Sequence, residues 1–584
     1  MGFSLCNVLV YSIVERILYQ VANFRFNIKH ALSLLLFGIF YGVGLKLQYQ
    51  LFSSMFGMIG LGLYFALICI WSVSERMWPL NAVKICGLAL LFLALCTAVI
   101  LFWKNFGVFS LDSYSYYEIA TTIGKKFGTV STIRQYVIDT EYNISFPYFY
   151  PLCIWIMDKL TGIGHYAGIL VNYYVVILTA VLLLYVSKMF VNRLWCGGLA
   201  IVLLCTTSSY MEEVAMARSI PLAILCMVIL LSVLGYCCFP NEQKVHIFYY
   251  WALGVGAGIL VSTRFDGMIA VAYFAILILL ASRNRLINAG LYLAGCLLTA
   301  SPWVIYSIVR VGKIWASDNS GTAFLVEPSV PSRVYTPNES EALLTLFNAP
   351  KLWFISRIQN FLNNLRSLLS CNYISTVLLC VCIAYLLYRV ASRKMARNNI
   401  ILSLVILLFY AGKFAMYVIV GYSDIRYHAE AAIVGVFVIL IVCAREQLKL
   451  EKAVIVALFI SLVGGMYAQF GNTIIPLRNW AILSSVEVAP QRVVELEQDL
   501  EGYLSKSTPI LMLDFYVDFS GWSNRTVYVP PAVPSWENVQ YILKQKNIHY
   551  VILAKDTKYP EILSELQMRG NCLELSTFYL FAVP

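Results

Sequence analysis

Residues 246–282 read HIFYYWALGVGAGILVSTRFDGMIAVAYFAILILLAS, which is two apolar runs joined by a short polar turn at residues 262–267. An α-helix rises about 1.5 Å per residue, so a run of roughly 17–25 apolar residues crosses a hydrocarbon core about 30 Å thick. Apolar runs of this kind recur along most of the chain. The pattern predicts an all-α polytopic membrane bundle.

We expect about thirteen membrane spans, preceded by an amphipathic helix near residues 8–24. Basic residues cluster in short loops that all fall on one side if the N-terminus is inside, as the positive-inside rule requires of cytoplasmic loops. An odd number of spans then puts the C-terminus outside. The expected spans lie near residues 30–47, 53–73, 83–103, 165–187, 194–210, 219–238, 246–263, 267–282, 286–309, 371–389, 399–420, 429–444 and 453–471.

The composition agrees with a membrane protein. Of the 584 residues, 60% are hydrophobic and only 12% are charged, whereas soluble domains carry about 25% charged residues. The net charge is +11, but the basic residues follow the expected topology, so we exclude nucleic-acid binding. Most of the 16 cysteines lie within apolar runs without metal-ligand spacing and are interpreted as small buried side chains.

Three domains are expected. Residues 1–82 form the amphipathic helix and two accessory spans, and residues 83–480 form the main transmembrane domain with outer loops 104–160 and 310–370. Residues 485–584 have a soluble composition and alternate short β-type runs with helical stretches, which predicts a small α/β domain on the outer face.

The first outer loop opens with an acidic, tyrosine-rich stretch, SLDSYSYYE at residues 110–118. Asp112 directly follows a predicted span, so we expect it at the membrane–water boundary. A carboxylate there can accept a proton from an incoming hydroxyl group, and neighbouring tyrosines can stack against a sugar. The alternative is a loop acid with no chemical role.

Two adjacent acids, Glu212 and Glu213, are expected at the outer end of a span, with Arg218 near the start of the next. The acids can stay solvated at a helix–helix turn, or they can bind a hard divalent cation, which prefers oxygen ligands. An unpaired arginine is costly at the edge of an apolar span. Arg218 is therefore expected to pair with one of these acids or to bind a lipid phosphate.

The polar turn at residues 262–267 holds the most informative charges, Arg264 and Asp266. Opposite charges between two short apolar runs need water, each other or a ligand. A guanidinium offers a planar clamp for phosphate, although an ion pair that reaches the outer surface explains the same pattern. A later outer turn carries Arg426 and Tyr427, and Arg426 is a further candidate partner for phosphate or carboxylate.

Taken in order, these features resemble the GT-C superfamily of membrane glycosyltransferases, especially its protein mannosyltransferase and aminoarabinose transferase members. The shared features cover about residues 83–471. They are an Asp after an early span, a Pro-Leu start to a surface helix, an outer acidic pair, ARS opening a span, TRFDG between spans and IRY near the last spans.

The resemblance implies that Asp112 is the catalytic residue. Many relatives have a second acid next to it, whereas here Ser113 follows and the next acid is Glu118, which we assign to the substrate site. The family's second outer acid matches Glu212 or Glu213, which are the candidate metal ligands.

The resemblance further implies that arginines face the donor phosphate. They match Arg218, Arg264 and Arg426, and we place Asp266 and Tyr427 in the same substrate site. No cofactor is certain, and the one candidate is a divalent cation, Mg or Mn.

We therefore predict an inverting transfer of a sugar from a polyprenyl-phosphate donor to a lipid, glycan or protein acceptor. The expected location is the outer face of a bacterial inner membrane, within the lipid bilayer. Two rivals stay open: a polymerase or ligase of cell-surface polysaccharide, favoured by the arginines of loop 310–370, and a transporter of lipid-linked sugars without catalysis.

Overall fold

The structure is a computed structural model. It describes residues 109–123, 133–134, 146–192, 194–238, 247–282, 284–312, 314, 322–326, 344–395, 397–446, 491–516, 519, 523, 525–528, 530–531 and 535–583. The predicted N-terminal amphipathic helix, the three spans before residue 104 and the span at 453–471 lie outside the described residues.

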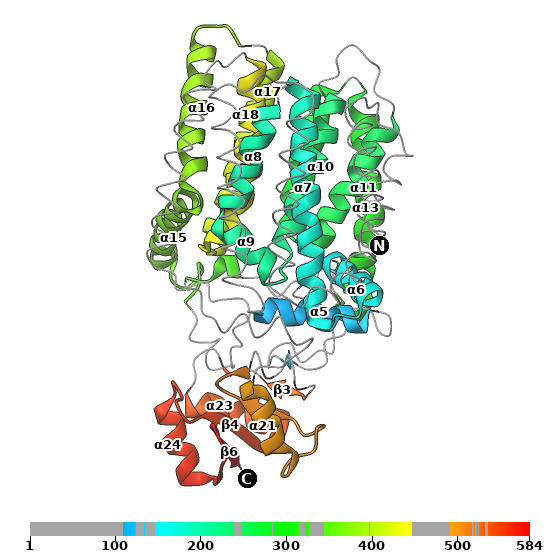
Figure 1. The fold of residues 1–584 in the computed structure, drawn as a ribbon. Coiled ribbons are helices and arrows are strands. Elements are labelled where there is room, and N and C mark those ends of the chain that lie inside the picture. Colours follow the sequence, from blue (N-terminus) through cyan, green and yellow to red (C-terminus); the bar gives the residue numbers. More distant parts are fainter. Residues whose placement is uncertain are drawn as a thin grey trace, which may run out of the picture.

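A bundle of apolar helices forms the body of the molecule (Figure 1). Every span predicted between residues 165 and 444 is helical. Five described helices are long and apolar enough to cross a membrane, or six if α9 (Ser208–Ala215) and α10 form one bent span. The multi-pass helical architecture is thus confirmed, while the count of thirteen and the orientation stay predictions. The bundle contains these spans together with shorter apolar helices: α7 (Ala167–Val191), α8 (Leu194–Thr206), α10 (Ile220–Cys238), α11 (Phe248–Thr263), α12 (Gly267–Ala281), α13 (Arg285–Tyr306), α16 (Tyr373–Ala391), α17 (Arg397–Val420) and α18 (Val436–Arg445), with the π-helical turns η2 (Ser307–Val311) and η5 (Ala431–Gly435).

Small residues bring α11 and α13 into close contact. A Cβ atom added at Gly254 would collide with the Tyr292 carbonyl group, and one at Gly258 would collide with the Thr299 side chain. Helices in a bilayer gain little from hydrophobic burial against each other, so such close backbone approach is a common source of their packing energy. This packing fixes the start of α12, where Arg264 and Asp266 lie.

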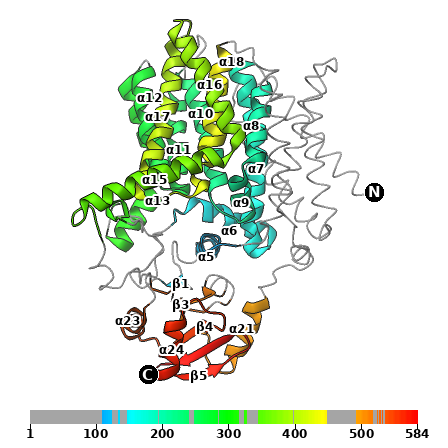
Figure 2. The same cartoon turned by 90° about the vertical axis from the view of Figure 1, so that its left-hand side faces the viewer.

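Helices that do not belong to the predicted spans gather at one end of the bundle, the end that also faces the C-terminal domain (Figures 1 and 2). One of them, α15, lies inside the predicted loop 310–370, where the sequence analysis expected no helix. Its buried positions include Arg357 and Asn364, whereas Phe354 and Leu362 are exposed. A helix that turns its polar side to the protein and its apolar side outward suits a lipid interface. These elements are α5 (Leu111–Thr122), α6 (Phe149–Thr161), η1 (Gly164–Tyr166), η3 (Thr322–Phe324), α15 (Pro350–Cys371) and η4 (Ile425–His428).

The C-terminal region is a small α/β domain, as predicted. Its sheet has the strand order β1-β3-β2-β4-β6-β5, with parallel pairing from β1 to β4 and antiparallel pairing among β4, β6 and β5. The elements are β2 (Ile510–Met512), β3 (Val527–Tyr528), β4 (Tyr550–Ala554), β5 (Asn571–Glu574) and β6 (Phe578–Ala582), with α21 (Gln491–Glu501), α23 (Trp536–Lys546) and α24 (Pro560–Arg569).

Alternating side chains give this sheet two buried faces. Ile510 and Met512 pack in the core that includes α21, whereas Leu511 and Leu513 pack in the core that includes α23 and α24. Successive strand residues point to opposite faces, so a fully buried strand is apolar at every position. The domain therefore has helices on both sides of its sheet.

The remaining strand comes from the first predicted outer loop. β1 (Ile133–Arg134) pairs in parallel with β3, so Ile133 lies opposite Val527 and Arg134 opposite Tyr528. Strand pairing thus joins the loop that follows α5 to the C-terminal domain. The sequence analysis did not predict this pairing.

Candidate active site

A sharp break between α9 and α10 forms the centre of the site. The two helices meet at 116°, and Ala217 adopts a left-handed conformation with φ of 54°. The break removes backbone carbonyl groups from helical hydrogen bonding, and a buried carbonyl needs another donor. The buried Asn172 side chain supplies one, because its Nδ2 donates to the carbonyl oxygens of Arg218 at 2.9 Å and Glu213 at 3.2 Å. The Glu213 carbonyl group also accepts from the Arg218 amide at 3.0 Å.

Helix α5 is attached to this break by side-chain hydrogen bonds. Ser110 caps α5 by accepting from the Ser113 amide, and Ser113 Oγ also donates to the Met216 carbonyl group. Tyr116 lies 2.9 Å from Ser219 Oγ. Burial raises the pKa of Tyr116, so its phenol stays protonated at neutral pH. These contacts hold the first turn of α5 against the break.

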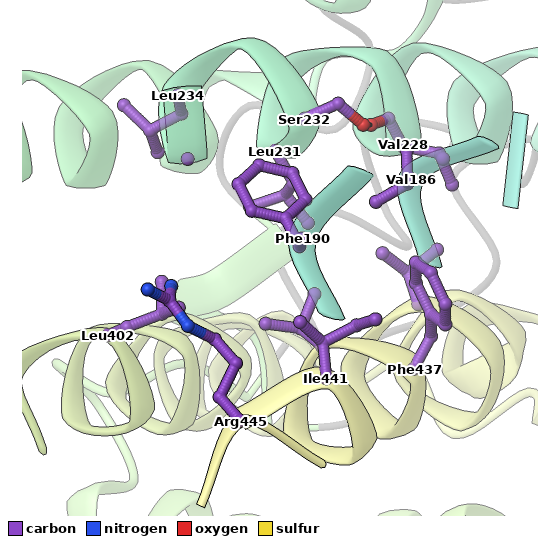
Figure 3. A pocket seen from close by; sticks show the side chains of 13 residues that line it. Val186, Phe190, Val228, Leu231, Ser232, Leu234, Leu402, Phe437, Ile441 and Arg445 are labelled. Atoms are coloured by element: carbon purple, nitrogen blue, oxygen red, sulfur yellow. Dashed lines mark hydrogen bonds between the residues drawn. The ribbon is translucent and has the colours of Figure 1, made fainter. Parts of the chain in front are cut away.

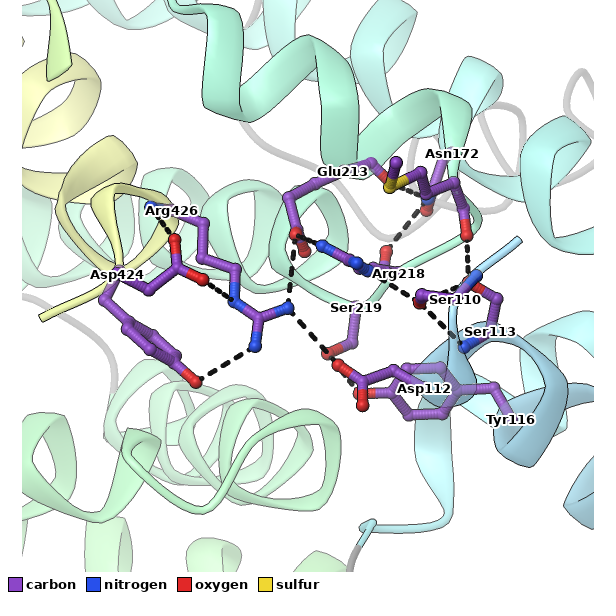
Figure 4. Close-up of polar contacts among 12 residues, drawn as sticks. Ser110, Asp112, Ser113, Tyr116, Asn172, Glu213, Arg218, Ser219, Asp424 and Arg426 are labelled. Atoms are coloured by element: carbon purple, nitrogen blue, oxygen red, sulfur yellow. Dashed lines mark hydrogen bonds and ion pairs between the residues drawn. The ribbon is translucent and has the colours of Figure 1, made fainter. Parts of the chain in front are cut away.

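Four charged side chains meet where α5 touches the break (Figure 4). Arg218 Nη1 lies 2.6 Å from Glu213 Oε1, and Arg218 Nε donates to Ser110 Oγ at 2.9 Å. Arg426 Nη1 lies 3.3 Å from Asp112 Oδ2 and 3.7 Å from Glu213 Oε1. The Glu213 side chain is 2% exposed and that of Asp112 is 32% exposed, so Asp112 is the carboxylate that an incoming molecule can reach.

The short helix η4 directs Arg426 toward this cluster. Asp424 caps η4 by accepting from the Arg426 amide at 3.0 Å. Its other carboxylate oxygen lies 3.1 Å from Arg426 Nε. The guanidinium also lies over the Tyr427 ring, 5.1 Å from its centre, so both its backbone and its side chain are constrained.

A second arginine shares the same aromatic ring. Arg264 lies 5.7 Å from the centre of the Tyr427 ring, and its Nε donates to Asp266 Oδ1 at 3.1 Å. Burial alone would raise the pKa of Asp266, but the charges of Arg264 and Lys413 hold it well below its ordinary value. Asp266 is therefore ionised at neutral pH. Tyr427 thus links the α11–α12 turn to the η4 turn.

The predicted site residues therefore do gather, with two exceptions. Asp112, Arg218 and Arg426 meet directly, and of the two adjacent acids it is Glu213 that joins them. Glu212 is not within salt-bridge distance of a described cation. Glu118 lies six residues after Asp112, which turns it about 120° around α5 from that position.

The described residues do not form a ready divalent-cation site. No group of three or more His, Cys, Asp and Glu side chains is close enough among them. The Glu213 oxygen that Mg or Mn would need is already held by Arg218 and faces Arg426. The assignment of Glu212 and Glu213 as metal ligands stays a prediction.

The sequence analysis did not single out Lys413 and Glu430, which lie behind Arg264. Lys413 Nζ is 2.9 Å from Glu430 Oε2 and 3.4 Å from Asp266 Oδ2. Both residues lie within predicted apolar spans, where ionisable residues are rare and usually functional. That rarity was the available signal, although the pairing of Lys413 with Glu430 could not be predicted from it.

A separate apolar pocket lies at the other end of the bundle (Figure 3). Its walls come from α7, α10, α17, η5 and α18, and its only polar side chains are Ser232 and Arg445. Arg445 is at the end of α18 that is far from η4. This pocket offers no group for proton transfer and is not part of the candidate site.

Comparisons with known proteins support the fold. No protein-family model and no curated protein matches the chain. The solved structure of ArnT from Cupriavidus metallidurans bound to undecaprenyl phosphate matches with a TM-score of 0.51 and 11% identity, over 84% of this chain and 97% of that one. Oligosaccharyltransferase AglB from Archaeoglobus fulgidus, in complex with an inhibitory peptide and a dolichol-phosphate, matches with a TM-score of 0.49 and 11% identity, over 85% and 74%. The predicted resemblance is confirmed at the level of architecture: this chain shares the fold of the ArnT structure.

Proposed function

We propose that the chain transfers a sugar from a polyprenyl-phosphate donor to a lipid, glycan or protein acceptor at the outer membrane face. The observation that carries the proposal is the position of Asp112. Its accessible carboxylate lies at one end of a membrane bundle, 3.3 Å from an arginine. An accessible base beside cationic groups is the combination that transfer from a lipid phosphate requires.

In the proposed reaction, the acceptor oxygen bonds to the anomeric carbon of the sugar. Its proton passes to the Asp112 carboxylate, and the bond from that carbon to the phosphate oxygen breaks. The polyprenyl phosphate leaves with the electron pair. Attack on the face opposite the phosphate inverts the configuration at the anomeric carbon.

The arginines would act on the leaving group. Negative charge grows on the phosphate as its bond to the sugar breaks, and fixed cations stabilise that charge. Arg426 and Arg264 flank one aromatic ring, so they are suited to hold one phosphate between them. Arg218 would support them by holding Glu213.

A phosphate at Arg426 would also affect Asp112. In the free protein Arg426 Nη1 is within ion-pair distance of Asp112 Oδ2. A guanidinium that turns toward phosphate no longer occupies this carboxylate. Donor binding would thus leave Asp112 free to accept the acceptor's proton.

The rival functions have less support. The polymerase or ligase hypothesis relied on the arginines of loop 310–370. One of them, Arg357, is buried on α15 and donates to the Leu325 carbonyl group. The transporter reading expects its ionisable groups near the bilayer centre, whereas Asp112, Glu213 and Arg426 meet at one end of the bundle.

The test is transfer by the purified full-length protein in lipid nanodiscs. A panel of undecaprenyl-phosphate-linked sugars is supplied with lipid, glycan and peptide acceptors, and wild type is compared with Asp112→Asn. We expect the variant to lose at least about a hundredfold in kcat, because the general base is removed. It should bind the donor at least as tightly as wild type, because the Asn side chain no longer competes with the phosphate for Arg426.

The matched control is Asp556→Asn, which alters an exposed carboxylate of the C-terminal domain. It should keep wild-type kcat. Undiminished transfer by a well-folded Asp112→Asn protein would reject the role of Asp112, and transport of the donor without any transfer would reject the enzymatic proposal itself.

A further inference from the structure

A buried chain of charges lies behind Arg264. Lys413 is in the middle of the apolar helix α17, and its Nζ contacts Glu430 Oε2 at 2.9 Å and Asp266 Oδ2 at 3.4 Å. The Lys413 side chain is 8% exposed and that of Glu430 is 9% exposed. Lys413 thus connects two acids that belong to different turns of the site.

The Asp266 carboxylate is shared among three donors. Its Oδ1 accepts from Arg264 Nε at 3.1 Å. Its Oδ2 accepts from Tyr417 at 2.8 Å and also faces Lys413. The Asp266 carboxylate therefore neutralises the Arg264 guanidinium only in part.

Stability does not explain why this pair is buried. Removing two charges from water costs several kcal/mol per ion, and replacing a buried ion pair with well-packed apolar residues is often neutral or stabilising. A membrane span makes ionisable residues still more costly. A positional role accounts for Lys413 and Glu430 where a purely structural role does not.

The free donors of Arg264 show what that role is. Its hydrogen bond to Asp266 uses Nε, so among the described residues its two terminal amino groups have no hydrogen-bond acceptor. They belong to a guanidinium that shares the Tyr427 ring with Arg426. A partly neutralised guanidinium with two unused amino groups can bind a phosphate.

Resting on the proposed function, we infer that Lys413 is a positioning residue for the donor phosphate. By holding one oxygen of Asp266, Lys413 keeps that carboxylate from neutralising Arg264 completely. Glu430 limits this effect, because it competes with Asp266 for the same ammonium group. The donor affinity of Arg264 is thus set by residues that do not touch the donor.

The inference predicts effects of opposite sign for two changes within one ion pair. Without the Lys413 charge, the Asp266 carboxylate should neutralise Arg264 more completely. Phosphate binding to Arg264 should then weaken. Neutralising Glu430 releases Lys413 toward Asp266 and should leave phosphate binding unchanged or tighter. A pair that only stabilised the bundle would give losses of the same sign in both cases.

The experiment measures binding of undecaprenyl monophosphate to the full-length protein in nanodiscs by microscale thermophoresis. Lys413→Met alone would leave Glu430 without a partner, so the informative variant is Lys413→Met/Glu430→Gln, compared with Glu430→Gln and wild type. We expect the double variant to bind at least about tenfold more weakly, since a charge-assisted hydrogen bond contributes about that factor. Glu430→Gln should bind at least as tightly as wild type.

A matched control removes a buried ion pair from the opposite end of the bundle. Arg389 Nη2 lies 2.8 Å from Glu446 Oε2, and Arg389→Met/Glu446→Gln should bind undecaprenyl monophosphate as wild type does. Equal weakening in Glu430→Gln and the double variant, or no change in either, would overturn the inference and leave the proposed function standing. A wild-type protein that does not bind this lipid would overturn both.

Discussion

Removing Arg218 should destabilise the protein through the carboxylate that it leaves behind. Arg218 Nη1 lies 2.6 Å from Glu213 Oε1, and the Glu213 side chain is 2% exposed. Arg218→Met keeps the apolar stem but leaves an acid buried beside the helix break. Water cannot readily solvate that acid, so the remaining cation, Arg426, has to compensate its negative charge.

The distances set the expected size of the effect. At an effective dielectric constant of about 20, charges 2.6 Å apart attract by about 6 kcal/mol and charges 3.7 Å apart by about 4.5 kcal/mol. Desolvation offsets much of this energy, and breaking a buried pair usually costs about 3–5 kcal/mol. Arg426 still faces Glu213 at 3.7 Å, so we expect Arg218→Met to cost about 3 kcal/mol.

A double-mutant cycle tests this reasoning. Glu213→Gln removes the buried charge itself and should cost only about 1–2 kcal/mol. The double variant Arg218→Met/Glu213→Gln should therefore be more stable than Arg218→Met alone, even though it carries one more change. The assay is the apparent Tm of the purified protein in detergent micelles. A double variant whose Tm loss equals the sum of the two single losses would refute the account.

Three further predictions concern the turns around the site. Tyr427→Phe keeps the ring that both arginines share and should change donor KM by less than about threefold, whereas Tyr427→Ala should raise it about tenfold, as measured by donor titration of the transfer rate. Asn172→Ala removes the side-chain donor of the Arg218 carbonyl group and one of the two donors of the Glu213 carbonyl group, and it should lower stability by about 2 kcal/mol, as measured by thermal unfolding. Because the folded-state pKa of Asp266 is lowered, its contribution to stability is complete above pH about 4 and is lost as the pH falls through the folded-state value. Asp266→Asn should thus lower Tm at pH 7, and its difference from wild type should shrink in strong acid.

Hydrophobic run length was enough to predict most of the helices. The segment 267–282 is nearly uniformly apolar and corresponds to α12, and the helical stretches expected within residues 485–584 include α23 and α24. Such predictions succeed because lipid favours long apolar runs, and a packed core favours apolar residues that recur with the period of the helix. The α15 helix was missed because its polar side faces the protein, which reverses the usual pattern.

The site could be predicted only as a set of candidates. Charges that interrupt apolar runs identified Asp112, Arg264 and Arg426, because a charge near lipid needs a partner. The choice between Glu212 and Glu213 depends on a 116° break that the sequence does not show. Long-range pairings, such as β1 with β3, depend on contacts between distant residues and were likewise out of reach.

The balance of charge in the site has a consequence for the proposed reaction. The cluster has no surplus of cations with which to attract a phosphate, since its acids outnumber its bases. Arg426 can bind the phosphate beside Arg264 only if it exchanges a carboxylate partner for it, and the partner at the cluster is Asp112. Donor binding and release of the base are then one event, so an acceptor would meet a free Asp112 only when the donor is in place. The acids are Asp112, Glu213, Asp266, Asp424 and Glu430, and the bases are Arg218, Arg264, Lys413 and Arg426. This coupling would keep Asp112 paired with Arg426, and so unable to activate a hydroxyl group, until a donor is bound.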